Sequence, residues 1–86
     1  MKNTERKLKA LANKRRLEIL KYLKKEKEAS VGDIADAIKL SIKATSKHLG
    51  VLSAADLVEK DQRSLLVFYS VSKILPAFVK EVLLGL

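Results

Sequence analysis

The tightest constraint on the fold is a two-residue break between two short helical patterns in the middle of the chain. Residues 31–39 place four apolar side chains at the i, i+3, i+4, i+7 spacing of one helix face: Val31, Ile34, Ala35 and Ile38. Leu40-Ser41 interrupts the pattern, and serine is a favoured N-cap. We therefore expect a second helix over about residues 42–54, joined to the first by a tight turn.

Two further helices are expected before this pair. Thr4 to Lys7 fits a helix start, and Leu8 and Leu11 follow at helical spacing. Asn13 can break or cap, and a second helix is expected over about residues 14–25. Its apolar face is predicted from four side chains: Leu17, Ile19, Leu20 and Leu23.

After Asp56 the sequence period changes from that of a helix to that of a strand. Residues 57–60 form one short strand candidate, residues 61–64 are polar and predict a turn, and residues 65–70 are rich in β-branched and aromatic side chains. A last helix is expected from Val71 or Ser72 to the end, with Pro76 marking either its true start or a kink. The order α-α-α-α-β-β-α predicts a mainly α winged helix-turn-helix with a small β-hairpin, forming a single domain over residues 1–86.

The apolar set of the last helix is too wide for one side of a small domain, which predicts a second surface to bury it. A copy of the same chain is the simplest source of that surface. We therefore interpret residues 71–86 as a C-terminal dimerisation helix of a homodimer. The expected interface consists of Leu8, Leu11, Leu75, Phe78, Val79, Val82, Leu83 and Leu86.

The formal net charge is +8, and its distribution is uneven. Residues 1–28 carry eleven bases against four acids, whereas the stretch from Ala37 to Ala55 has no acid and three lysines: Lys39, Lys43 and Lys47. An acid-free basic segment within a basic chain suits a polyanion such as DNA. The plainer interpretation, that the lysines only keep the surface soluble, stays open on charge alone.

Several function classes are disfavoured by what the sequence lacks. It has no cysteine and one histidine, so it offers neither a thiolate metal site nor a cysteine nucleophile. It also lacks a glycine-rich phosphate loop, and a chain of this length has little room for a substrate pocket. We expect no enzyme activity, no cofactor and no metal. No run of about 18 apolar residues is present, and no secretory signal, so a cytoplasmic protein without a membrane contact is expected.

Three segments in order resemble the ArsR-type repressors. Residues 8–20 are similar to the opening of that family, Val31 to Ala35 to its first motif helix, and residues 40–52 to its recognition helix, with the signature Ser46-Lys47-His48-Leu49. Leu57-Val58 follows where the family enters its wing, so that the resemblance covers residues 8–70. It implies a homodimer that binds operator DNA, usually as a repressor, with the recognition helix in the major groove. The contacts it implies are Ser41, Lys43, Ala44, Ser46, Lys47 and His48.

The sequence departs from the family pattern at two kinds of site. Ala29 and Ser30 stand where many members carry a metal-binding cysteine, and the last helix has no histidine and one acid, Glu81, so neither family metal site can be built. The wing lacks the usual tip glycine followed by a basic residue. Its basic residue is Arg63, which we expect to contact phosphate or the minor groove. Nothing in the sequence indicates an effector.

Some assignments stay open at this level. His48 fits a DNA-backbone contact or a packed structural role, and residues 14–16 fit a positive patch near DNA or a solvated helix start. One of Phe68 and Tyr69 should enter the core. For the whole protein, the alternative to a DNA-binding regulator is a winged-helix module that binds other proteins.

Overall fold

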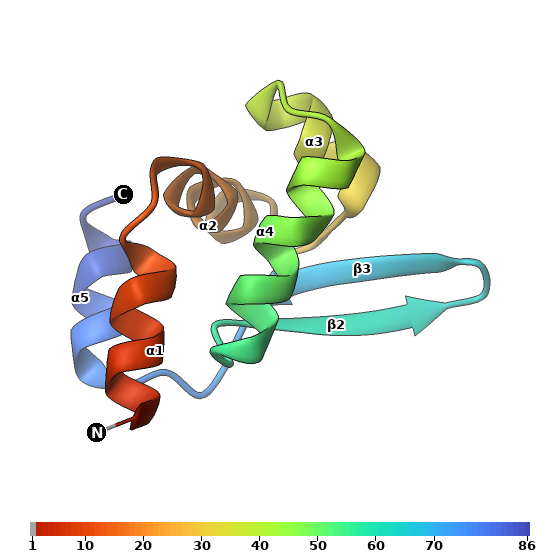
Figure 1. Cartoon of the computed structure of the whole chain (residues 1–86). Coiled ribbons are helices and arrows are strands. Elements are labelled where there is room, and N and C mark those ends of the chain that lie inside the picture. The colour runs from red at the N-terminus through yellow and green to blue at the C-terminus, as the bar shows by residue number, and fades with distance from the viewer. Residues whose placement is uncertain (1) are drawn as a thin grey trace.

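The computed structural model describes residues 2–86, which fold into five helices packed around a small antiparallel sheet (Figure 1). The structure has the winged helix-turn-helix fold that the element order predicted, with one additional short strand. In chain order the elements are α1 (Lys2–Leu11), α2 (Lys14–Glu26), β1 (Ala29–Ser30), α3 (Val31–Ile38), α4 (Ile42–Ala54), β2 (Val58–Arg63), β3 (Leu66–Val71) and α5 (Ala77–Leu84).

Three helices begin at side-chain caps, of which the sequence predicted those at Asn13 and Ser41. Asn13 precedes α2, Ser30 precedes α3 and Ser41 precedes α4. Each side-chain oxygen accepts a hydrogen bond from the backbone N–H three residues further on, at 3.1 to 3.2 Å. These bonds satisfy N–H groups that have no partner within the first helical turn. At the turn between α3 and α4, the Ser41 cap fixes where α4 begins.

The hairpin differs from the prediction in its turn. The expected turn over residues 61–64 is wrong, because β2 continues to Arg63 and pairs residue by residue with β3, from Val58↔Val71 to Arg63↔Leu66. The loop is only Ser64-Leu65, and Ser64 has a φ of 58°. Polar residues can belong to the strand here because both faces of a projecting hairpin tip are in water. Pairing with β3 maintains the strand conformation. The hairpin extends well beyond the helices (Figure 1).

The sheet has a third strand that was not predicted. β1 pairs with β3, which gives the order β1-β3-β2, and its register is Ala29↔Tyr69 and Ser30↔Phe68. A strand of two residues is too short to show a period of two. Tertiary pairing alone defines it.

The last helix begins later than expected. α5 starts at Ala77 rather than at Val71 or Ser72, and Pro76, with a φ of −66° and a ψ of 157°, is its N-cap. Val71 belongs instead to β3, where it pairs with Val58. A residue before proline is also disfavoured in helical conformation, so Pro76 marks the true start of α5 and not a kink.

The core lies where α2, α3 and α4 meet the base of the sheet. On α4 the inner face consists of Thr45, Leu49 and Leu52, which are fully buried. From α1 and α5 the core receives Leu11, Val79 and Leu83. Tyr69 packs against this core, as one of the two wing aromatics was expected to do. Among residues 2–86 no helix is both long and apolar enough to cross a bilayer.

Candidate nucleic-acid interface

The outward face of α4 is basic, small and open. Lys43, Ser46 and Lys47 are exposed on the side opposite to the buried Thr45 and Leu49. Gly50 lies on the same side, and nothing stands within 4 Å of the place where a Cβ would be. In the part of the chain that the structure describes, neither Lys43 nor Lys47 takes part in an ion pair. This face can approach a polyanion closely and can donate hydrogen bonds to it.

The start of α4 adds a second donor group to this face. The Ser41 hydroxyl oxygen is occupied as the cap acceptor for the Ala44 N–H at 3.1 Å, while the side chain itself is exposed. Its hydroxyl hydrogen is thus available to an outside acceptor. Ala44 is half-buried, so that only part of its methyl group can be reached. The structure brings five of the predicted contacts to one face and one end of α4; their contact with DNA remains a prediction.

His48, the sixth predicted helix contact, lies on the flank of α4 and is half-buried. Its Nδ1 is 3.3 Å from Nη1 of Arg16, which donates to it, so Nδ1 is the unprotonated nitrogen. Burial, then the positive charges of Arg16, Arg15 and Lys47, lower the pKa of His48 below the usual 6.5. His48 is thus held by Arg16 within the chain, and its contact with DNA remains a prediction.

Arg15 and Arg16 bind the ends of neighbouring helices. Arg15 donates to the Ile38 carbonyl oxygen at 2.7 Å and pairs with Glu18 at 3.1 Å. Arg16 donates to the carbonyl oxygens of Ala10 at 2.6 Å and Lys9 at 3.1 Å. Both side chains form hydrogen bonds to backbone carbonyls of the same chain, which neither sequence interpretation of residues 14–16 anticipated. Those carbonyls belong to other helices, so no local pattern could show it.

Arg63, the predicted wing contact, is held by acids of its own chain. Nη1 donates to Glu28 Oε1 at 2.9 Å, Nη2 contacts Glu28 Oε2, and Nε donates to Asp61 Oδ2 at 2.9 Å. The guanidinium carbon also lies 4.6 Å from the ring centre of Phe68. The hydrogen bond from Arg63 lowers the pKa of Glu28, and those carboxylates raise the pKa of Arg63. Glu28 was not anticipated, since it is 35 residues away along the chain.

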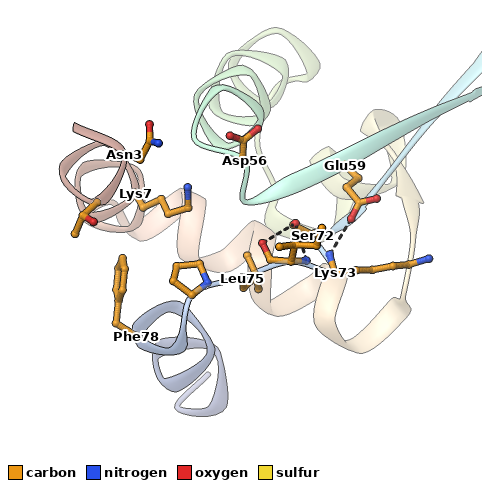
Figure 2. A pocket seen from close by; sticks show the side chains of 11 residues that line it. Asn3, Lys7, Asp56, Glu59, Ser72, Lys73, Leu75 and Phe78 are labelled. Carbon is orange, nitrogen blue, oxygen red and sulfur yellow. Dashed lines mark hydrogen bonds between the residues drawn. The ribbon is translucent and has the colours of Figure 1, made fainter. Parts of the chain in front are cut away.

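A groove of about 850 Å³ lies on the other side of the molecule, between α1, the connection from β3 to α5, and the start of α5 (Figure 2). Lys7 enters it from α1, and Phe78 extends from α5 toward α1. Glu59 accepts a hydrogen bond from the Lys73 backbone N–H at 2.7 Å, which fixes one wall. Within residues 2–86 no three histidine, aspartate or glutamate side chains gather in a way that could hold a metal ion.

The predicted dimer residues divide into two groups. Leu11, Val79 and Leu83 are in the core of the single chain. Leu8 and Val82 are exposed by 53% and 37%, and Leu75, Phe78 and Leu86 are half-buried. Ile74 and Leu84, not in the predicted interface, are exposed by 88% and 72%. α1 and α5 lie on the same side of the molecule, away from the tip of the wing (Figure 1).

The fold and the basic face of α4 define a winged helix-turn-helix protein. Residues 11–61 match the helix-turn-helix domain family, and the chain therefore belongs to it. Its arrangement is that of the ArsR-type winged helix, as the sequence motifs indicated.

The curated relatives include a transcriptional activator and a nodulation protein. The transcriptional activator HlyU of Vibrio cholerae is 43% identical over 65 residues, which are 76% of this chain and 59% of HlyU. The nodulation protein NolR of Rhizobium meliloti is also 43% identical over 65 residues, or 52% of its length. The chain thus spans between half and three fifths of these curated relatives.

Solved structures show the same fold over nearly the whole chain. HlyU from Vibrio cholerae superposes with a TM-score of 0.81 and 36% identity, covering 96% of this chain and 86% of that one. The homodimeric winged helix-turn-helix DNA-binding domain of Mb0332 from Mycobacterium bovis superposes with a TM-score of 0.82 and 30% identity, covering 98% and 74%.

Proposed function

We propose that the protein is a transcriptional regulator that binds operator DNA as a homodimer through α4. The observation that carries this proposal is the outward face of α4, where Lys43, Ser46 and Lys47 are exposed together without an acid. Exposed lysines and a hydroxyl next to an open helix surface are the groups that bind phosphates and base edges. The helix-turn-helix membership and the regulator relatives support the same conclusion.

The homodimer follows from the apolar surface on α1 and α5. Leu8, Ile74, Val82 and Leu84 expose large apolar side chains that a second copy would cover. Mb0332, which superposes over 98% of the chain, is described as homodimeric. A two-fold dimer would set two α4 helices into successive major grooves, about 34 Å apart, so the operator should be an imperfect palindrome.

The direction of regulation depends on where the operator lies. The ArsR-type resemblance implies repression, whereas HlyU is named as an activator. A dimer that only occupies its operator represses when the site overlaps a promoter. We propose repression by such occupancy.

Selection from a pool of random duplex DNA tests the proposal. The purified protein should enrich a palindrome with half-sites about one helical turn apart. Lys43→Gln/Lys47→Gln should weaken binding to the enriched duplex and reduce the slope of log K against log salt by up to about two units. The matched control is Lys21→Gln/Lys25→Gln, which removes the same charge from exposed positions of α2.

An equal loss in both double variants would contradict the proposal, because the net charge of +8 alone would then attract the DNA. Failure to enrich any sequence would contradict it as well. Either result would favour the winged helix as a protein-interaction module.

A further inference from the structure

The Arg63 side chain connects the two outer strands of the sheet. Arg63 is the last residue of β2, while Glu28 directly precedes β1, and β3 lies between them. The guanidinium crosses the outer face of β3 above the Phe68 ring and reaches both carboxylate oxygens of Glu28. Lys27, with a φ of 75°, ends α2 and turns the chain so that Glu28 meets the sheet there.

These contacts use the part of Arg63 that would bind DNA. An arginine binds a phosphate through the two parallel N–H groups of its fork, and Glu28 occupies that fork in the same bidentate geometry. Asp61 takes the Nε hydrogen. The charges of these three side chains, two carboxylates and one guanidinium, sum to −1. A phosphate that approached it would have to displace Glu28 and would then lie next to a bare carboxylate.

We propose that Glu28 sets the affinity of the wing for DNA by occupying the Arg63 fork in place of a phosphate. The wing then adds no phosphate contact of its own through Arg63, and sequence-independent binding is limited to α4 and its surroundings. The inference rests on the proposed DNA binding, since it concerns one contact of that complex. Because Arg63, Glu28 and Asp61 are all largely exposed, the exchange needs no rearrangement of the core.

The experiment is a salt titration of Glu28→Gln against a short duplex of random sequence. Removing the carboxylate frees the fork, so one additional phosphate contact forms. The slope of log K against log salt should become steeper by about 0.9, and affinity near 0.1 M salt should rise roughly five- to tenfold. The control is Glu26→Gln, the same charge change at an exposed position two residues earlier, where the carboxylate forms no hydrogen bond or ion pair with Arg63 in residues 2–86. It should leave the slope as in the wild type.

A double variant separates the Arg63 contact from general electrostatics. In an Arg63→Gln background, Glu28→Gln should no longer steepen the slope. Equal slopes for Glu28→Gln, Glu26→Gln and wild type would overturn the inference, as would a gain that persists without Arg63. The wild-type protein serves as the test of the proposed function itself, because its binding to the selected operator does not depend on either outcome. Thermal unfolding of each variant checks that the fold is kept.

Discussion

At the scale of single residues, much of the basic charge of α2 stabilises helix ends and does not form a binding surface. Arg15, Arg16 and Lys24 each donate to a backbone carbonyl near the end of another helix, at 2.6 to 2.7 Å. Those helices are α3, α1 and α5 respectively. The last carbonyls of a helix lack partners within it and carry partial negative charge, so a cation there is favourable. α2 thereby connects three helices through charge-assisted hydrogen bonds.

One residue of α4 has an unsatisfied polar atom. Thr45 is fully buried, and its hydroxyl oxygen has no hydrogen-bond partner among residues 2–86. Thr45→Val replaces the hydroxyl by a methyl group of similar size, so we expect the free energy of unfolding to rise by about 1 kcal/mol. Thr45→Ser is the control: it keeps the hydroxyl and removes the methyl group, so it should lower that free energy. Chemical denaturation measures both, and a destabilised Thr45→Val would show that the hydroxyl has a partner.

At the scale of elements, one side chain connects α1 to α4. Arg16 projects from α2, holds the carbonyls at the end of α1 and donates to His48 on α4. Arg16 thus links the end of α1 to α4 through the neutral ring of His48. The charged groups that face this ring are Arg16 and Arg15 from α2 and Lys47 from α4, all of them positive. Protonation of His48 would add a further positive charge to this cluster.

This contact predicts a pH dependence of stability. The pKa of His48 is lower in the folded chain than the value of about 6.5 in the unfolded chain, so the unfolded state binds more protons below that value. The contribution of neutral His48 to the free energy of unfolding is complete above about pH 6.5. It is lost as the pH falls through the pKa that His48 has in the folded chain. His48→Gln can still accept from Arg16 but cannot titrate, so its stability should change less between about pH 7.5 and 5.5. Parallel curves for variant and wild type would contradict the assignment.

At the scale of the whole molecule, large apolar side chains are exposed on α4, at Ile42 and Val51, and at two further places that lie far apart. One is the α1 and α5 side, with Leu8, Val82 and Leu84, and the other is the wing tip, with Leu65 exposed by 94%. Figure 1 shows the hairpin projecting away from α1 and α5. In the proposed dimer, the α1 and α5 surfaces of two copies would meet without covering the wing tip.

Val82 on α5 and Leu65 at the wing tip provide a matched pair of substitutions that tests the proposed dimer. Val82→Lys should raise the dissociation constant of the dimer by about 100-fold, since a two-fold interface loses the side chain twice, at about 1.5 kcal/mol each. Leu65→Lys, an equivalent change at the wing tip, should leave the dimer intact. Sedimentation equilibrium checks this against the 9.6 kDa mass of one chain. A monomeric wild type, or equal dissociation of both variants, would contradict the proposed interface.

The sequence was sufficient wherever the deciding interaction is local. The caps at Asn13, Ser30 and Ser41 act within three residues, and the inner face of α4 follows from the helical period, so both could be predicted. The basic outer face of α4 follows from the same period. The sequence alone therefore predicted this face of α4 as the candidate site.

Tertiary structure decided everything that depends on partners distant in the chain. β1 is a strand only because it pairs with β3. Val71 belongs to β3 and not to α5 because it pairs with Val58. The sequence does not reveal the hydrogen-bond partners of three arginines in this basic chain: Arg15, Arg16 and Arg63. Their partners Ile38, Ala10 and Glu28 are 23, 6 and 35 residues away. A long side chain takes its role from whatever the fold brings within hydrogen-bonding distance, and no local pattern records that distance.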